Sequence, residues 1–375
     1  MSLFSRTAQH IAVLAAVGGL IVAMPTAAVA GQAPADHHSA FAVHQVNLVS
    51  DTPGAAALTD PDLVNPWGLA LSPTSPLWVA NNGTNTSTLY TSAADTTTAA
   101  KVAAIRVTFP KAAALPTGQV FNGGTGFLNN PAVPTSSGRF IFSTITGSIA
   151  SWSPVVDPLQ GDLEVKATVP GAAYTGLAIA TATAGDELFA ANFAQGTVDV
   201  FSTTFAKVTQ SPFAFRDFFL PRSFHPFNVQ ALGGNIFVAF AKVDPTTGRS
   251  QAGRGLGAVD EFTADGKFVT RIATGQTLNA PWGLAIAPAS WGSLAGSLLI
   301  GNFGDGRVNV VSPDKDGDFQ HFISSQVHNA AGGVLTIPRL WALTQATAST
   351  GGADALWFSA GPGGEMHGLL GVLRP

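Results

Sequence analysis

The sequence predicts an all-β fold, a six-bladed β-propeller with four-stranded blades. Two short phrases recur along the chain. The first is Asn-Pro-Trp-Gly-Leu-Ala-Leu at residues 65–71, which returns as Ala-Pro-Trp-Gly-Leu-Ala-Ile at 280–286. The second is an apolar run followed by Asn, found at residues 77–82, 188–193 and 298–303. Short apolar runs that repeat every ~50 residues, with Gly and Asn at the turns, are typical of a radial repeat such as a propeller.

Six anchor residues predict where the innermost strand of each blade begins. Neighbouring anchors are 50 to 59 residues apart, which leaves room for four strands in every blade. Apolar and polar residues alternate at 196–201 and again at 306–311, as expected of half-buried strands. No segment after the N-terminal one has a convincing helical period. The anchors are Gly68, Gly126, Gly176, Asn228, Gly283 and Ala342.

The last blade predicts how the ring closes. It offers only three strands, at residues 340–343, 356–360 and 366–373, before the chain ends. A strand-like run at 41–49 precedes the first blade and can supply the fourth. Because an unpaired strand edge invites aggregation, we expect the N-terminal strand to complete the last blade. Residues 41–375 then form a single domain.

The N-terminal segment has the pattern of a secretory signal. Arg6 and His10 precede an apolar run at residues 11–22, and Ala28-Val29-Ala30 offers small residues for cleavage. The run is too short for a membrane anchor, and no later stretch could span a bilayer. We therefore predict a signal peptide at 1–30, cleavage near Ala30-Gly31, a flexible lead-in at 31–40 and a secreted or periplasmic protein.

Composition excludes several functional classes. The chain has no cysteine, so disulfides, zinc–thiolate sites, iron–sulfur clusters and thiol catalysis are excluded. The net charge is −4, only 11% of residues are charged, and no basic stripe exists, so nucleic acid is not an expected partner. No nucleotide-binding fingerprint or serine-hydrolase elbow occurs, and we expect no nucleotide or haem cofactor.

Several phrases together resemble an uncharacterised family of secreted bacterial six-bladed propellers, which is similar to the NHL-repeat, gluconolactonase and strictosidine-synthase-like superfamily. The resemblance implies the fold and export, and it transfers no catalytic residues. His225 departs from the family pattern, which requires no histidine before Pro-Phe-Asn, so a mechanism resting on His225 alone is in doubt. The phrases lie at residues 65–68, 191–201, 226–230, 279–283, 301–307 and 360–369.

Blade topology predicts which side chains meet at one mouth of the axial channel. The connection into each innermost strand and the turn between the second and third strands lie on the same face of a propeller, close to its axis. Loops at channel mouths commonly hold ligands. The predicted ligand-binding residues are Asn65, Asn192, His225, Asn279, Asn302, Asp305, Arg339, Glu365 and His367.

Two interpretations stay open for most of these residues. Glu365 and His367, two apart at the start of a strand, would point the same way and could bind a metal or share a proton, or could be a surface pair without a role. The recurring asparagines could offer oxygens to calcium, or could cap turns. A three-histidine zinc site from His225, His328 and His367 competes with ordinary surface histidines.

The tryptophans and one long loop also have two interpretations each. Trp67, Trp282 and Trp341 begin three innermost strands, where they could stack on a sugar or wedge the blades together. Residues 242–257, with Arg249 and Arg254, could fold over the mouth as a lid that brings cations to an anionic ligand, or could be a disordered loop.

The sequence thus predicts an exported, monomeric propeller that binds a small molecule, a carbohydrate or a protein at its channel mouth. The alternative is a calcium- or zinc-dependent hydrolase or lyase at the same mouth, by analogy with six-bladed lactonases. This analogy concerns the fold only. The residues do not decide whether the chain is an enzyme.

Overall fold

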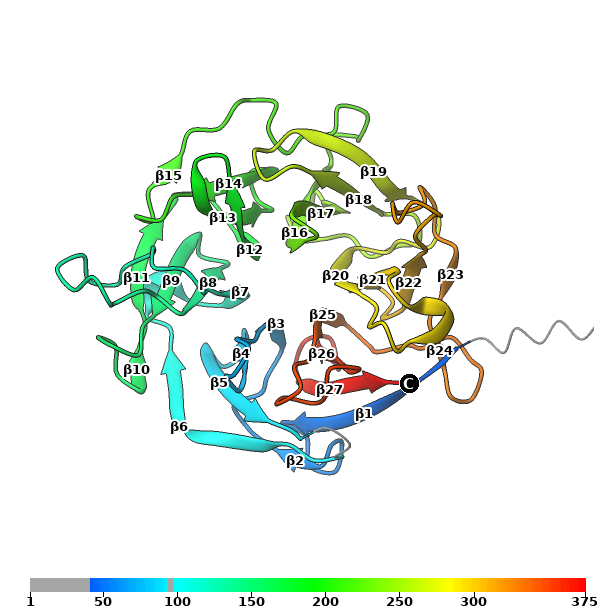
Figure 1. Cartoon of the computed structure of the whole chain (residues 1–375), viewed down its shortest axis with the longest axis horizontal. Coiled ribbons are helices and arrows are strands. Elements are labelled where there is room, and N and C mark those ends of the chain that lie inside the picture. Colours follow the sequence, from blue (N-terminus) through cyan, green and yellow to red (C-terminus); the bar gives the residue numbers. More distant parts are fainter. Residues whose placement is uncertain (1–40, 94–96) are drawn as a thin grey trace, which may run out of the picture. The chain divides into compact units, whose positions relative to one another are not determined.

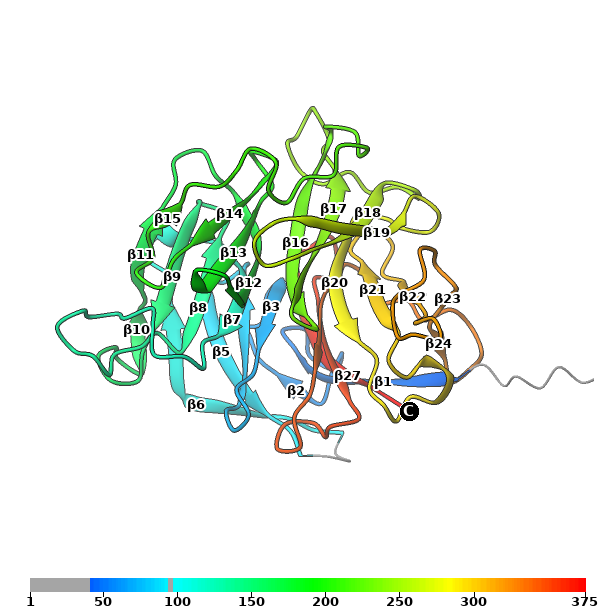
Figure 2. The ribbon, with the colours of Figure 1, turned by 45° about the horizontal axis from the view of Figure 1, so that its top comes forward.

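The computed structural model describes residues 41–93 and 97–375. The predicted signal peptide and lead-in lie outside these residues. The described chain is almost entirely β-structure and forms a ring of six blades, confirming the predicted fold. Figure 1 looks down on the ring, with one innermost strand of each blade around the centre, and Figure 2 shows it tilted. Within the described residues, no helix is long and apolar enough to cross a membrane.

Strands follow one another outward in each of the first three blades. Blade one contains β3 (Pro66–Ala70), β4 (Leu77–Asn81), β5 (Thr86–Thr91) and β6 (Ala100–Thr108), with β10 (Gln160–Asp162) added at its edge. Blade two contains β7 (Pro116–Phe121), β8 (Phe140–Thr144), β9 (Ser148–Trp152) and β11 (Glu164–Thr168). Blade three contains β12 (Tyr174–Ala182), β13 (Gly185–Asn192), β14 (Thr197–Phe201) and β15 (Lys207–Val208).

The remaining blades have the same order, and the last is completed by the N-terminal strand. Blade four contains β16 (Phe224–Leu232), β17 (Asn235–Lys242), β18 (Gly257–Phe262) and β19 (Phe268–Thr274). Blade five contains β20 (Pro281–Ile286), β21 (Leu298–Asn302), β22 (Val308–Val311) and β23 (Ser325–Gln326). Blade six contains β25 (Leu340–Gln345), β26 (Leu356–Ala360), β27 (Leu369–Arg374) and β1 (Ala42–Ser50). Two 3-10 turns, η1 (Lys111–Ala113) and η2 (Gly292–Leu294), lie between strands.

Ring closure occurs as predicted, between the two ends of the chain. β1 pairs antiparallel with β27 from His44 opposite Arg374 to Ser50 opposite Leu369. Two short strands, β2 (Leu58–Thr59) and β24 (His328–Asn329), add to β1 in parallel. The outer edge of blade six is therefore covered along part of its length.

One predicted anchor is wrong. The innermost strand of blade two is β7, and its anchor is Gly118 rather than Gly126. Gly126 lies in the connection from β7 to β8, where the next residue, Phe127, is buried among side chains of blades two and three. The Pro-x-Gly pattern of blade one recurs at residues 116–118, but the Gly-Gly pair at 123–124 obscured it because it resembles a turn before a strand.

Glycines at the anchor position let neighbouring innermost strands approach closely. A Cβ atom on Gly68 would lie 2.4 Å from the carbonyl oxygen of Thr117, and one on Gly118 would lie 2.2 Å from the backbone nitrogen of Leu177. Real Cβ atoms do not make such contacts. In blade four the anchor is Asn228, whose Nδ2 donates to the carbonyl oxygen of Trp282 at 2.8 Å. The anchors thus lie where neighbouring innermost strands approach each other closely.

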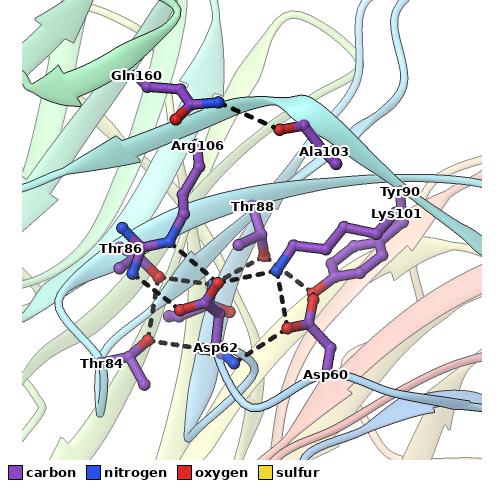
Figure 3. A network of polar contacts seen from close by, with 11 residues as sticks. Asp60, Asp62, Thr84, Thr86, Thr88, Tyr90, Lys101, Ala103, Arg106 and Gln160 are labelled. Atoms are coloured by element: carbon purple, nitrogen blue, oxygen red, sulfur yellow. Dashed lines mark hydrogen bonds and ion pairs between the residues drawn. The ribbon is translucent and has the colours of Figure 1, made fainter.

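A network of ions joins the segment that follows β1 and β2 to blade one (Figure 3). Lys101 Nζ lies 2.8 Å from both Asp60 and Asp62, and Arg106 binds Asp62 through Nε and Nη2 at 3.0 and 2.8 Å. The hydrogen bond from Arg106 lowers the pKa of Asp62 to about 2, against the opposing effect of burial. Burial and the Asp60 charge raise the pKa of Tyr90, whose hydroxyl donates to Asp60 at 2.6 Å. The network fastens the closing segment to the first blade.

Candidate functional site

Aromatic side chains from five blades fill the axis at the predicted mouth. All are at most 4% exposed, and they form one buried cluster. The Trp67 and Trp341 rings are stacked with centroids 3.5 Å apart. Phe303 also stacks on Trp341, with centroids 4.1 Å apart. Such pairs contribute about 0.5–1.5 kcal/mol each beyond the burial of their area. This aromatic plug consists of Trp67, Phe193, Phe227, Trp282, Phe303 and Trp341.

The plug decides the role of the tryptophans. Trp282 Nε1 donates to the carbonyl oxygen of Thr175 at 2.8 Å, linking blade five to blade three, and Trp341 Nε1 donates to Asn65 Oδ1 at 2.9 Å. They pack the blades together and are too deeply buried to stack on a ligand. The predicted mouth, here called the plug face, is therefore closed below its surface loops.

Three predicted residues meet over the plug. Glu365 Oε2 lies 3.4 Å from Asn65 Nδ2, and both carboxylate oxygens of Glu365 accept hydrogen bonds from Arg249 Nη2, at 2.6 and 2.7 Å. Arg249 belongs to the 242–257 loop, which therefore lies over this face as the lid interpretation expects. The loop is also held at Gly253, whose N–H donates to Asn279 Oδ1 at 2.6 Å.

The other asparagines hold turns within their own blades. Asn192 Oδ1 accepts from the Gln195 N–H, and its Nδ2 donates to Asp199 at 3.0 Å. Asn302 also bonds to its own turn in blade five: its Oδ1 accepts from the Asn279 N–H at 3.1 Å, and its Nδ2 donates to Asp305 at 3.0 Å. Both asparagines are fully buried. The geometry favours the turn-capping interpretation for these two side chains.

The structure does not bring the three candidate histidines together. His225 Nδ1 lies 2.6 Å from the Phe193 carbonyl oxygen, and His367 Nδ1 lies 2.9 Å from Asp51 Oδ2. His328 was expected at the mouth, but it lies in β24 beside β1, the outermost strand of blade six, because the chain makes a detour before β25. Among the described residues, no group of three His, Asp or Glu side chains could hold a metal ion.

Glu365 and His367 also fail to act as a pair. Both belong to the turn before β27, which begins only at Leu369, so the alternation of a strand does not apply to them. Glu365 has a left-handed backbone, φ 74°, and contacts Asn65 and Arg249, whereas His367 contacts Asp51. The expectation that their side chains point the same way is wrong.

Arg339 is the remaining predicted residue of this face. Its guanidinium lies 4.8 Å from the ring centroid of Phe303, at the top of the plug. Among the described residues it has no ion pair. A cation held by an aromatic ring and lacking a carboxylate partner is available to an anionic group.

The open end of the channel lies on the opposite face. There, the innermost strands of all six blades surround a cavity of about 650 Å³. A much smaller cavity of about 20 Å³, which shares some of its lining residues, continues toward the plug. Each strand contributes two side chains spaced two residues apart, which point to the same side of a strand. The inner ring is Leu69, Gln119, Leu177, Gln230, Leu284 and Leu343. The outer ring is Leu71, Phe121, Ile179, Leu232, Ile286 and Gln345.

We call this cavity the axial funnel. Its volume falls in the range of ordinary small-molecule sites, which are mostly apolar with a few polar groups. The polar side chains of the two rings are three glutamines, Gln119 and Gln230 in the inner ring and Gln345 in the outer ring. Gln119 Nε2 donates to the Trp78 carbonyl oxygen, but its Oε1 is buried with no hydrogen-bond partner among the described residues. Buried acceptors of this kind are rare without a water or ligand partner.

Sequence reasoning missed the funnel because its residues look like core. Leu, Ile and Phe at alternate positions predict a buried strand whether they face a neighbouring blade or an open axis. The available signal was Gln119 and Gln230, which interrupt otherwise apolar strands at the same position of two blades.

The fold and the funnel define a six-bladed β-propeller with a ligand-sized opening at one end of its axis. In sequence the chain is similar to uncharacterised proteins of Acanthamoeba polyphaga mimivirus. L690 is 34% identical over 280 residues, 72% of this chain and 72% of L690. R648 is 35% identical over 269 residues, 70% of this chain but just under two thirds, 65%, of R648. The chain belongs to the same family as L690. No family model matches it.

Solved structures of similar shape are distant in sequence. A virginiamycin B lyase from Staphylococcus aureus is 11% identical, with a TM-score of 0.46 over 89% of this chain and 99% of the lyase. A gluconolactonase from Xanthomonas campestris is 14% identical, with a TM-score of 0.37 over 63% of this chain and 81% of that protein. The bacterial source implied by the motif resemblance finds no support among the sequence relatives, which are viral.

Proposed function

We propose that this protein is an exported binding protein that takes a small, largely apolar molecule into the axial funnel. The observation that carries the proposal is the funnel itself, an opening of about 650 Å³ with two rings of side chains from all six blades. Nine of the twelve ring positions are neither Gln nor charged, so the walls favour an apolar body.

The glutamines determine where the polar group of the ligand would lie. Gln119 Oε1 has no donor in the described structure, and it lies in the inner ring where the funnel narrows. A ligand with one N–H or O–H group at its tip would satisfy this oxygen and would remove the cost of leaving it unpaired, about 1–3 kcal/mol. The preferred ligand is therefore a neutral apolar molecule with one hydrogen-bond donor at the end that enters first.

The test uses N-phenyl-1-naphthylamine, a neutral apolar fluorophore with one N–H group, and its N-methylated analogue, which has none. We expect saturable fluorescence enhancement with one site per chain and weaker binding of the N-methylated probe. Gln119→Leu should reduce that preference for the N–H. Its melting temperature is measured in parallel, because the substitution also removes the bond to the Trp78 carbonyl oxygen.

A matched pair of variants locates the site. Leu232→Glu places a charge in the outer ring of the funnel. Leu159→Glu places a charge at an exposed position in the connection between β9 and β10. Binding should fall in the first variant and stay unchanged in the second. Equal affinity of both variants, or no saturable binding by the wild type, would rule out the funnel as the site.

A second candidate is anion binding on the plug face, as the predicted mouth residues suggest. It is favoured by Arg339, whose guanidinium has an aromatic support but no ion pair in the described residues. Titration calorimetry with citrate should give binding that Arg339→Ala abolishes and that the funnel variant Leu232→Glu leaves intact. Citrate binding equal in wild type and Arg339→Ala would exclude this site.

Export is proposed from the first thirty residues alone, which lie outside the described structure. The full chain expressed in a secreting bacterium should be recovered outside the cytoplasm with an intact mass that starts at Gly31. Recovery of the uncut chain from the cytoplasm alone would contradict export.

A further inference from the structure

Blade three lacks half of its outer strand. β15 has two residues and pairs with β14 only at Val200–Val208 and Phe201–Lys207. β14 itself pairs with β13 along its whole length, from Thr197 to Phe201. In blade two, by contrast, the outer strand β11 covers β9 from Ser148 to Ser151. The half of β14 nearer the plug face thus has no strand beside it.

The free half of β14 offers main-chain hydrogen-bonding groups. In an antiparallel ladder, every second residue bonds to the same neighbour. The Ser202 N–H donates outward to the Ala206 carbonyl oxygen at 2.9 Å, so Val200 and Val198, two and four residues earlier, also direct their N–H and C=O groups outward. No described residue bonds to the two groups of Val198. In blade five, where β23 is equally short, the following chain does cover the edge, since the Val327 N–H donates to the Val308 carbonyl oxygen at 2.9 Å.

A groove of about 870 Å³ runs beside this edge. One wall is residues 196–199 of blade three, and the other is the connection from β15 to β16, residues 209–223. Phe215 and Phe240 supply apolar surface inside it. The free half of β14 spans about 10 Å at the usual rise of a strand. The groove therefore has the position and the size for a short extended segment.

The groove carries unpaired positive charge. Arg216 and Arg222 line it, and neither has an ion pair among the described residues; the Arg216 guanidinium lies 5.1 Å from the Phe218 ring centroid. The two carboxylates of the groove are already occupied. Asp199 pairs with Lys207 at 2.9 Å, and Asp217 pairs with Arg271. An acidic ligand would thus meet two free guanidinium groups.

Exposed aromatic side chains flank the groove. Phe213, Phe218 and Phe219 are 65%, 61% and 88% exposed, which is unusual for phenylalanine. Aromatic residues and arginine are the types enriched in protein interfaces, and they supply most of the binding energy where they occur together. The connection that forms the groove wall therefore also has the composition of an interface.

We propose that blade three binds an extended peptide of a partner protein, with acidic and apolar side chains in alternation, as its missing outer strand. The peptide backbone pairs with the free edge of β14 at Val198, which is strand addition of the kind that many peptide-binding domains use. The acidic side chains of the peptide meet Arg216 and Arg222, and its apolar side chains meet the phenylalanines of the same connection, of which Phe218 lies beside Arg216. This site is separate from the axial funnel.

The first experiment measures the charge requirement. The probe is a pool of fluorescein-labelled heptapeptides in which Glu alternates with Val, Ile or Phe, and the readout is fluorescence anisotropy with the full mature chain. We expect saturable binding that the double variant Arg216→Glu, Arg222→Glu weakens at least about tenfold. Arg307→Glu, at an exposed arginine of blade five, is the matched control and should change the affinity less than about twofold. Circular dichroism melts verify that all variants are folded.

The second experiment measures the backbone requirement. Two series of peptides are methylated at alternate backbone nitrogens, one at the odd positions and the other at the even positions. Only one of the two series loses the N–H groups that would bond to β14. One methylated series should lose binding and the other should keep it, and hydrogen exchange at the Val198 amide should slow when the pool is bound. A naphthylamine probe in the funnel should not compete.

Five results would overturn the proposal. The first four are no saturable binding of the pool to the wild type, binding insensitive to the two arginines, equal effects of the two methylated series, and self-association of the chain that the double variant abolishes. The fourth would show that a second copy covers this surface. Co-sedimentation with phosphatidylglycerol vesicles, lost in Phe219→Ala, would likewise replace the peptide by a lipid surface.

Discussion

Arg249 of blade four and Glu365 of blade six are joined across the intervening blade by two hydrogen bonds, of 2.6 and 2.7 Å. Arg249 is mostly exposed, whereas Glu365 is largely covered and also contacts Asn65. The pair holds the 242–257 loop over the aromatic plug. A single exposed ion pair contributes little to global stability, so its effect should be local.

Arg249→Ala should therefore release the loop without unfolding the ring. We expect a change in the free energy of unfolding below about 1 kcal/mol and faster amide exchange at residues 244–251. Arg254→Ala, which removes a contact to the Gln276 carbonyl oxygen in the same loop, is the control and should leave those amides unchanged. Unaltered exchange in Arg249→Ala would show that the ion pair does not hold the loop.

Asp260 should make stability depend on pH. It lies fully buried in β18, and the groups facing it are Asp217 from the β15–β16 connection and Arg271 from β19, whose Nε lies 3.5 Å from Asp260 Oδ1. Burial, reinforced by the Asp217 charge and only partly opposed by Arg271, raises the pKa of Asp260 to about 8.

Because the folded pKa lies above the ordinary value of 3.8, the folded chain binds more protons than the unfolded chain between these limits. The Asp260 contribution to stability is therefore fully present below pH ~4 and is lost as the pH rises through about 8. Asp260→Asn should remove this dependence. Urea melts at pH 5 and pH 8 should show a larger loss for the wild type than for the variant, and equal losses would contradict the assignment.

Ring closure predicts the effect of removing β1. A mature chain that begins at Asp51 loses the entire pairing with β27 and exposes that strand. We expect a lower melting temperature and association of the free edges, detected by size-exclusion chromatography with light scattering. A chain that begins at Phe41 keeps β1 and should behave as the full mature protein. Identical melting and a monomeric state for both chains would show that β1 is dispensable.

The close approach of the innermost strands predicts a sharp penalty at the anchors. In Gly118→Ala the added methyl group would meet the backbone of β12 at 2.2 Å, so the strands must separate. We expect a loss of about 1–3 kcal/mol in the free energy of unfolding, the usual cost of overpacking. Gly123→Ala is the matched control in the same blade, since its methyl group would make an ordinary contact of 3.5 Å with Phe121. Similar losses in both variants would contradict the proposed cause.

The sequence predicted the number of blades and the closing strand because both follow from repetition and alternation. It placed Asn192 and Asn302 at equivalent turns correctly, since the same phrase surrounds them. It could not say which end of the axis is open, because that depends on how Trp67, Trp282 and Trp341 fill the space between blades. Residue type alone does not distinguish an apolar side chain that packs from one that lines a cavity.

Local turns limited the prediction of the site. The pairing of Glu365 with Arg249 joins residues 116 apart and depends on how a loop folds back, which no spacing rule captures. His328 was misplaced because the chain between β23 and β25 takes an added path through β24. Sequence patterns predict the repeated elements well. The contacts specific to this protein are made by segments that depart from the repeat, and the patterns do not predict them.

The pairing of β1 with β27 also fixes when the molecule can be completed. β1 is made before all six blades and β27 after every other strand of the ring, so the first five blades are synthesised before the strand that closes the ring exists. The ring can close only after β27 has been made. A chain interrupted near its C-terminus would thus lose the seal of the whole ring, not merely its last blade.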